Sequence, residues 1–320
     1  MERHPLAHEI VQQLQLHGFQ GRIVSVRHLG DLQEELETHH RLGHFDEEFY
    51  RERLTWFRFS PPEELPGAQS LIVAALPRPQ TQAVFRQNGK RVPLIIPPTF
   101  SASERTRQHL LGLLTDLLSP VGYRAALGRL PLKMLAVHSG LGAYGRNNIC
   151  YIPGMGSFLQ LVALFSDLPC PEDTWWPLRT MKRCEKCTAC QRRCPAGAIT
   201  AERFLLHAER CIVFHNERPG DVPFPAWIDP SWHHCLVGCM QCQAACPENR
   251  RFMRWVEDSE EFSGEETALL LRGVALDQLL PGTVEKLARL EMTDALDILP
   301  RNVGVLMRNS PLPETRGERR

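Results

Sequence analysis

The sequence predicts an α+β protein made of an α/β domain, a small cysteine-rich module and a helical C-terminal segment. Three observations support this prediction. Short apolar runs alternate with helical patterns in the first half, seven of the eleven cysteines fall in two tight runs between residues 184 and 246, and helical periodicity returns over residues 265–307. We place the domain boundaries at 1–178, 179–255 and 256–320.

Helical and extended segments alternate through the first half of the chain. Ser70–Leu76 is a short apolar run after a turn rich in Pro, which is typical of a buried strand. Ser101 or Ser103 is expected to cap the helix that follows. We expect helices at 6–16, 29–50, 103–118 and 132–138, extended segments at 21–26 and 70–76, and a further apolar run at 158–165.

Composition and charge exclude several classes of function. Lys and Arg number 37, and Asp and Glu also number 37, so the chain has no overall cationic field that would attract nucleic acid or an anionic membrane. The longest apolar runs are far shorter than the roughly 20 residues that span a bilayer. The N-terminal residues lack the basic stretch and apolar run of a signal peptide. We therefore expect a cytoplasmic protein without a membrane partner.

The first cysteine run has the spacing of bacterial ferredoxins. It reads Cys184-x2-Cys187-x2-Cys190-x3-Cys194-Pro195. In that arrangement a turning backbone presents three thiolates to one 4Fe-4S cluster, and the fourth thiolate points to a second cluster. Structural zinc is the alternative, but one zinc ion needs four ligands at most and has no use for a second run.

The second run is one ligand short. It reads Cys239-x2-Cys242-x3-Cys246-Pro247, and the position of its missing first cysteine is Leu236. Spacing alone leaves Cys211 and Cys235 as candidates for the missing ligand. Cys150 and Cys170 lie outside both runs and are expected to be buried, inert thiols.

A glycine-rich loop precedes the cysteine module. Gly140-Leu-Gly142-Ala-Tyr-Gly145 matches the GxGxxG pattern of dinucleotide-binding folds. The context is wrong for that fold, because a helical segment precedes the loop and Pro153, Gly154 and Gly156 prevent a helix after it. The loop is then either a backbone that a flat or bulky ligand approaches closely or an ordinary tight turn.

Several motifs in order resemble epoxyqueuosine reductase, a family of iron–sulfur and cobalamin enzymes of queuosine tRNA modification. The motifs are Leu65-Pro-Gly-Ala-Gln-Ser-Leu-Ile-Val-Ala-Ala75, His138-Ser-Gly-Leu-Gly-Ala-Tyr-Gly-Arg-Asn-Asn148, Gly156-Ser157-Phe158, the first cysteine run, Glu209-Arg-Cys211-Ile and Gly238-Cys-Met-Gln-Cys-Gln-Ala-Ala-Cys-Pro247. The resemblance covers roughly residues 60–250. It implies a corrinoid-binding α/β domain, similar to the core of reductive dehalogenases, beside a two-cluster ferredoxin module.

The resemblance also implies roles for individual residues. The isolated cysteine of the family corresponds to Cys211, which leaves Cys235 without a ligand role. One cluster is then expected on Cys184, Cys187, Cys190 and Cys246, and the other on Cys194, Cys211, Cys239 and Cys242. The residues expected to bind the cofactor, cobalamin or another corrinoid, are Gly140, Gly142, Tyr144, Gly145, Arg146, Asn147, Ser157 and Phe158.

The chain departs from the family where the substrate would bind. The family carries an Asp in an Asp-Ser/Thr-x-Pro context that supplies a proton to the substrate, and the matching stretch here, Ala126–Pro131, holds no carboxylate. The family's Arg-Tyr and Asp-Tyr-His segment is replaced by Val92–Ser101. Tyr144 and His138 are the candidate replacements for the missing acid, and Tyr123 is a further one. Packing is the competing interpretation for all three side chains.

These observations predict an iron–sulfur reductase. Single electrons from an external donor of the ferredoxin or flavodoxin type would pass through two 4Fe-4S clusters to a corrinoid that reduces an unknown small-molecule substrate, other than or including epoxyqueuosine. The alternative is a non-catalytic electron-transfer protein that serves a partner enzyme or corrinoid protein. A tRNA partner is less favoured, because the basic residues around the first run are better explained by a solvated surface or by an acidic electron donor.

Overall fold

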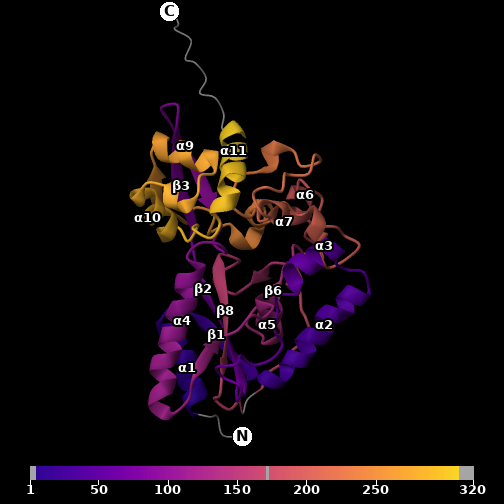
Figure 1. Ribbon diagram of the computed structural model, residues 1–320. Helices are drawn as coiled ribbons and strands as arrows, with labels where there is room; N and C mark the ends of the chain where they lie inside the picture. Colours follow the sequence, from indigo (N-terminus) through magenta and orange to yellow (C-terminus); the bar gives the residue numbers. More distant parts are fainter. Residues whose placement is uncertain (1–4, 171–172, 310–320) are drawn as a thin grey trace, which may run out of the picture. The chain divides into compact units, whose positions relative to one another are not determined.

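The computed structural model describes residues 5–170 and 173–309 (Figure 1). The chain forms two compact units, and each is assembled from separate stretches of sequence. The first unit comprises Met1–Pro79, Pro98–Cys211 and Gln241–Trp255, and the second comprises Gln80–Pro97, Ile212–Met240 and Val256–Arg320. The domain boundaries predicted after residues 178 and 255 stay a prediction.

A four-stranded antiparallel sheet forms the centre of the first unit. Its strand order is β1-β2-β8-β5, with β1 at Gln20–Ser25, β2 at Ser70–Pro77, β5 at Ala125–Leu127 and β8 at Leu159–Ser166. The two central strands pair over their whole length, with Ile72 opposite Leu164. This sheet brings the early apolar run and the run before the cysteine module side by side.

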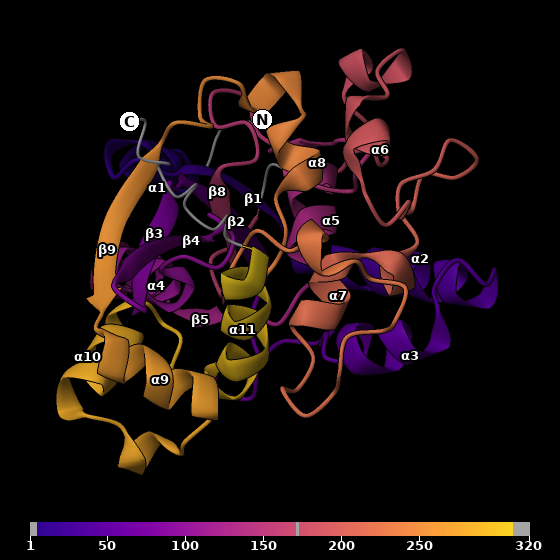
Figure 2. The same ribbon diagram turned by 90° about the horizontal axis from the view of Figure 1, so that it is seen from above.

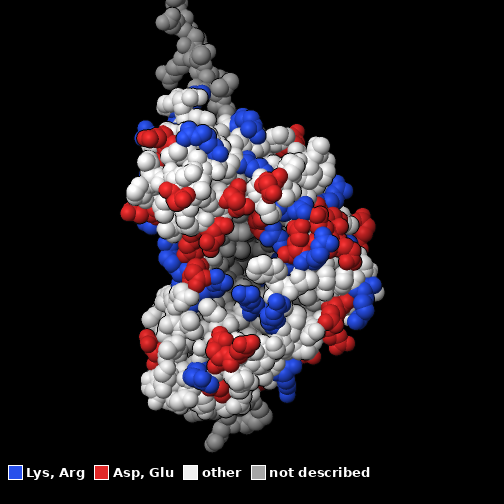
Figure 3. All heavy atoms as spheres, in the orientation of Figure 1, with Lys and Arg blue, Asp and Glu red and all other residues white. Residues whose placement is uncertain are grey.

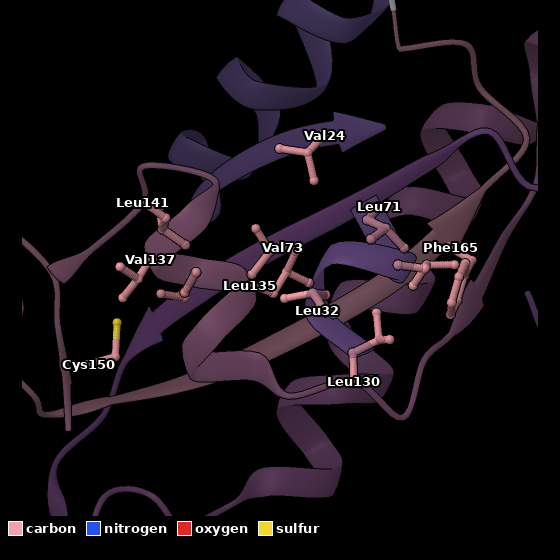
Figure 4. Packing of buried hydrophobic residues seen from close by; sticks show 14 of the residues in the cluster. Val24, Leu32, Leu71, Val73, Leu130, Leu135, Val137, Leu141, Cys150 and Phe165 are labelled. Carbon is pink, nitrogen blue, oxygen red and sulfur yellow. The ribbon is translucent and has the colours of Figure 1, made fainter. Parts of the chain in front are cut away.

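Both faces of this sheet are buried, as the unbroken apolar sequence of β2 requires. Leu71 and Val73 point into one core, where they meet Leu32 of α2 (Leu29–Arg41) and Leu135 of α5 (Leu132–His138) (Figure 4). Ile72 and Ala74, which lie on the opposite face of β2, point into a second core, built with α1 (Pro5–Leu16) and α4 (Ser103–Leu118). The sheet therefore holds α5, and the glycine loop after it, in a fixed position.

Short elements complete the first unit. They are η1 (Val26–His28), α3 (Glu47–Phe49), the π-helical turn η2 (Tyr50–Leu54), η3 (Ser119–Val121), β6 (Ala143–Tyr144), β7 (Cys150–Tyr151), η4 (Lys182–Glu185), α6 (Ala189–Arg193), η5 (Ala208–Arg210), α8 (Gln241–Ala244) and η7 (Pro247–Asn249). Cys184, Cys190 and Cys242 lie on three of these short helices, and Cys187, Cys194 and Cys246 lie in the connecting segments beside them, which is the local structure that ferredoxin spacing favours.

The second unit contains a three-stranded sheet and most of the C-terminal helices. The strand order is β4-β3-β9, and β3 pairs in parallel with β9 (Figure 2). The strands are β3 (Gln80–Gln87), β4 (Lys90–Ile96) and β9 (Val256–Phe262); the helices are α7 (Ile212–Asn216), η6 (Pro230–Trp232), α9 (Gly264–Arg272), η8 (Leu276–Gln278), α10 (Pro281–Arg289), η9 (Leu296–Ile298) and α11 (Leu299–Asn309).

The structure confirms most predicted elements and corrects three. The predicted helix over 29–50 ends at Arg41, because Gly43 adopts a φ of 68° and Asp46 caps a new turn. The N-cap of α4 is Ala102, in a left-handed conformation, and neither predicted serine caps the helix. The C-terminal segment is not wholly helical, because it begins with β9; residues 310–320 lie outside the described part.

Within residues 5–170 and 173–309, none of the helices has the length and apolar character that crossing a membrane requires.

Candidate iron–sulfur site

The structure brings together cysteines from both runs. Cys184 lies in η4 and Cys190 in α6, and each interacts electrostatically with Cys187 and with Cys246, which comes from the second run. Burial raises the pKa of the Cys184 and Cys190 thiols above its ordinary value. These four sulfur atoms, separated by up to 62 residues in sequence, are the set expected to hold one cluster.

A second group of cysteines gathers around Cys242. Burial raises the pKa of its thiol to about 12, and electrostatic interactions with Cys211 and Cys194 act on it as well. These are three of the four ligands expected for the other cluster. Cys239 belongs to the second unit, and its part in ligation stays a prediction.

The two groups interlock as the crossover rule for ferredoxin runs requires. Cys190 and Cys194 are one helical turn apart, and the Cys194 amide donates to the Cys190 carbonyl over 3.0 Å. Cys194 interacts with Cys242, and Cys190 interacts with Cys184, Cys187 and Cys246 as well as with Cys242, so the assignment of the two cysteines to different clusters stays a prediction. Among the described residues, no three His, Cys, Asp or Glu side chains lie close enough to hold a single metal ion. A cubane separates its thiolates farther than one ion does.

The glycine loop is closed by the chain's own atoms. A Cβ at Gly142 would lie 2.7 Å from the Cys150 sulfur, and a Cβ at Gly145 would lie 2.6 Å from the Tyr151 ring. The loop leads into the hairpin of β6 and β7, where Tyr144 pairs with Cys150, and no helix follows. The dinucleotide-binding interpretation therefore fails on context, as the sequence predicts.

Three consecutive side chains after the loop each hold a different part of the cysteine module. Arg146 donates to the carbonyl oxygens of Cys184, over 2.8 Å, and of Cys187, over 3.0 Å. Asn147 acts on the Cys242 thiol and lowers its pKa, against the larger effect of burial. Asn148, with a φ of 55°, donates to the carbonyl of Phe204 over 2.8 Å. The motif that resembles the family thus positions both groups of cysteines.

Ser157 and Phe158 anchor the second run in the same way. The Ser157 hydroxyl donates to Gln243 over 2.8 Å, and the Ser157 amide donates to Asn249 over 2.9 Å. Phe158 stacks on Phe252, with ring centroids 5.8 Å apart. These contacts hold the chain on both sides of Cys246.

The candidate proton donors are deeply embedded. Tyr144 is buried, its ring lies edge-on to Phe204, and burial raises the pKa of its hydroxyl. Both ring nitrogens of His138 are engaged, Nδ1 with the Trp176 carbonyl and Nε2 with Glu35 at 2.9 Å. Burial lowers the pKa of His138, but these two hydrogen bonds outweigh it and raise the pKa above its ordinary value.

The stretch that matches the family's Asp motif is tightly packed. Gly128 lies three residues before Pro131, the place where the motif has its Asp. A Cβ added to Gly128 would lie 2.7 Å from a ring atom of Phe165, which is almost completely buried. The position therefore leaves no room for a side chain unless Phe165 moves.

The cysteines outside the proposed ligand set differ in burial. Cys150 and Cys235 are both buried, and burial raises the pKa of each thiol to about 12. The predicted burial of Cys150 is confirmed. Cys170 is only partly buried, so its predicted burial is wrong.

Sequence reasoning missed four residues that build this site. Gln243 lies inside the second cysteine run and Asn249 lies two residues after its Pro247, and this closeness to Cys246 was a signal of a supporting role. Tyr151 follows the glycine loop, accepts a hydrogen bond from Asn147, and has Cys246 among the groups that raise the pKa of its hydroxyl. Glu35, the partner of His138, lies 103 residues away from it in sequence, and no local pattern indicates the pairing.

Comparison with known proteins also indicates an iron–sulfur protein. Residues 183–249 match the family model of a 4Fe-4S double cluster binding domain. An epoxyqueuosine reductase from Shigella dysenteriae is 27% identical over 98% of the chain and 84% of its own length.

Two solved structures share the fold. The structure of epoxyqueuosine reductase from Bacillus subtilis with its catalytic Asp loop swung out of the active site has a TM-score of 0.68 and 21% identity, over 95% of this chain and 81% of that one. An epoxyqueuosine reductase with an epoxyqueuosine-modified tRNA stem loop has a TM-score of 0.63 and 20% identity, over the same shares of the two chains. The chain is thus an epoxyqueuosine reductase-like protein: it is similar to that family over almost its whole length, and it carries a double 4Fe-4S cluster binding domain.

Proposed function

We propose that this chain is a reductase that passes single electrons through its two 4Fe-4S clusters to a corrinoid, and that its substrate differs from epoxyqueuosine. The interlocking of the two cysteine runs carries the proposal. Cys246 joins the first run, while Cys194 of that run lies near Cys242, so two clusters would be held close together in one unit. Adjacent clusters form a short path for electrons from the surface to a buried acceptor.

The corrinoid is the proposed acceptor because the resemblance of residues 60–250 to epoxyqueuosine reductases implies one. Of the eight residues expected to touch it, only Gly140 and Arg146 keep part of their surface open. Gly140 and Arg146 are therefore the residues that could contact the corrinoid directly, and the six buried residues would support them from below. When bound, a corrinoid supplies low-valent cobalt, which reduces the substrate. The protein's own contribution is to hold the cysteine module against the glycine loop.

A changed substrate is supported by the packing at Gly128. An epoxyqueuosine reductase with a catalytic Asp needs room for that side chain, and the ring of Phe165 fills this room here. His138 is a positioning residue in this proposal, because both of its ring nitrogens are bound to protein groups. Tyr144 holds its proton firmly, since burial raises the pKa of the hydroxyl.

The electron donor is proposed to dock beside the first cysteine run. Exposed basic side chains surround this run, and Arg183 pairs with Glu248 over 3.0 Å. A ferredoxin or flavodoxin with an acidic face would complement them. The remaining exposed basic residues are Lys182, Lys186, Arg192 and Arg193. On the face shown in Figure 3, acidic and basic side chains are interspersed.

The proposal is tested by anaerobic purification with iron, sulfide and cobalt counted per chain. We expect about eight iron atoms and, after reconstitution with cobalamin, one cobalt. About four irons would contradict the second cluster, and eight irons without cobalt would support the electron carrier instead. Incubation with an epoxyqueuosine-modified tRNA stem loop and a chemical reductant tests the substrate. Conversion to queuosine would overturn the proposed change of substrate.

A further inference from the structure

Tyr151 is the aromatic residue at the centre of a buried polar network. It is 4% exposed, and the nearby thiol of Cys246 contributes to the raised pKa of its hydroxyl. The same hydroxyl accepts a hydrogen bond from Nδ2 of Asn147 over 3.1 Å. A phenol donates one hydrogen and accepts others, so with Asn147 as donor the hydroxyl hydrogen is free to point at the sulfur.

Asn147 extends this network to a second sulfur. Asn147 is 2% exposed, and its side chain acts to lower the pKa of the Cys242 thiol, against the larger effect of burial. Its Oδ1 accepts from the Ile149 amide over 3.4 Å, which fixes the orientation of the amide group. Nδ2 carries two hydrogens: it donates one to Tyr151, and the second is available for the sulfur of Cys242.

The backbone is shaped to admit this pair. A Cβ at Gly145 would lie 2.5 Å from Oδ1 of Asn147 and 2.6 Å from the ring of Tyr151. The third glycine of the loop therefore makes room for the two side chains and not for a dinucleotide. Any larger residue there would push the donors away from the sulfur atoms.

We propose that Asn147 and Tyr151 form a hydrogen-bonded bridge between the two clusters and set their reduction potentials, Tyr151 through Cys246 and Asn147 through Cys242. This inference rests on the proposed ligation, in which Cys246 and Cys242 serve different clusters. Hydrogen bonds to a ligating sulfur stabilise the more negative, reduced cluster and raise its potential. The bridge thereby favours electron uptake at both clusters, and its two ends act on separate ones.

The test is a redox titration of the iron-loaded protein followed by electron paramagnetic resonance. Tyr151→Phe removes one hydroxyl and keeps the ring. We expect the equilibrium constant for reduction of the Cys246 cluster to fall about tenfold, so that its potential becomes more negative by about 59 mV for one electron. The potential of the other cluster should change little. Tyr50→Phe removes a hydroxyl from a ring stacked on His40 and should shift neither cluster.

Asn147→Ala provides the second arm. It removes the donor to Cys242 and leaves Tyr151 in place, so the larger negative shift should move to the Cys242 cluster. The signals are assigned to clusters by repeating Tyr151→Phe in a Cys211→Ser background, which is expected to retain only the Cys246 cluster.

The iron content distinguishes a failure of the proposed ligation from a failure of the proposed bridge. A wild-type chain with about four irons would overturn the proposed ligation itself. With about eight irons in wild type and variants, unchanged potentials in both Tyr151→Phe and Asn147→Ala would overturn the bridge alone. Equal shifts of both clusters in each variant would also contradict it, because they would indicate a general effect of packing.

Discussion

The imidazole of His138 and the carboxylate of Glu35 form an ion pair of 2.9 Å, with the His138 side chain only 8% exposed. Trp175 stacks on the same imidazole, with ring centroids 4.6 Å apart and 10° between the planes. On its other face Trp175 stacks on His28, 4.1 Å away. This stack joins α2, the end of α5 and the segment that leads to the cysteine module.

The pair makes part of the stability of the first unit depend on pH. Because the folded pKa of His138 is raised, the contribution is complete below the unfolded value and is lost as pH rises through the folded value. We expect Glu35→Gln to cost about 1.5–3 kcal/mol at pH 6 and less at pH 8.5. Thermal unfolding of the iron-loaded protein across this pH range checks this. Glu34→Gln, on the exposed face of α2, is the matched control, and an equal loss in both variants would contradict the prediction.

Glu266 predicts the opposite pH dependence in the second unit. It forms a capping box with Ser263 and accepts hydrogen bonds from Thr283 over 2.9 Å and from Lys286 over 2.7 Å. Burial raises the pKa of Glu266, but these hydrogen bonds outweigh it and lower the pKa below its ordinary value. The stabilisation is therefore present above the unfolded pKa and is lost as pH falls through the folded one.

We expect Glu266→Gln to cost about 1.5–3 kcal/mol at pH 7 and to lose this effect at pH 3–4. Urea unfolding followed by the fluorescence of the chain measures it. Glu265→Gln, one residue earlier and exposed, should change little. A Glu266→Gln variant as stable as wild type at pH 7 would show that the capping network contributes nothing.

The sequence predicted those features that depend on local spacing. The ferredoxin run fixes which thiolates can share a cluster, because three ligands lie on one turning backbone. Ser70–Leu76 was recognisable as a buried strand, since both of its faces are apolar. The roles of Arg146 and Asn147 were half predicted: the loop was expected to matter, but its contacts with the cysteine module were not.

Features that depend on distant pairing could not be read from the sequence. β9 has the sequence VEDSEEF, which is too acidic to resemble a strand, and it forms because it pairs in parallel with β3, where Val256 lies opposite Gln80, 176 residues earlier. Its charges are compensated in the fold, where Glu261 meets Arg91 over 2.7 Å. The interleaving of the two units has the same origin, since each is assembled from three separate stretches.

The packing at Gly128 predicts a sharp difference between two glycines. Gly128→Ala places a methyl group 2.7 Å from Phe165 and should cost about 1–3 kcal/mol. Gly112→Ala, in α4, meets nothing within 4 Å and should stabilise the protein by about 0.5–1 kcal/mol. Thermal unfolding compares the two. Phe165→Leu combined with Gly128→Ala should recover part of the loss, and a Gly128→Ala variant of wild-type stability would show that Phe165 yields easily.

Substitution of Cys211 and of Cys235 tests which of the two thiols is a ligand of the second cluster. Cys211 lies beside Cys242 in the first unit, whereas Cys235 is buried in the second unit, where its strand bridge to Ile95 fixes the backbone. A cluster that loses one of four thiolates binds iron weakly, so Cys211→Ser should fall from about eight iron atoms to about four. Cys235→Ser should retain about eight, because a buried thiol replaced by a hydroxyl affects packing and not ligation. Iron and sulfide analysis with Mössbauer spectroscopy of both variants decides between them. About eight iron atoms in Cys211→Ser together with a loss of iron in Cys235→Ser would show that Cys235 is the fourth ligand of the second cluster. About eight iron atoms in both variants would show that neither cysteine is that ligand.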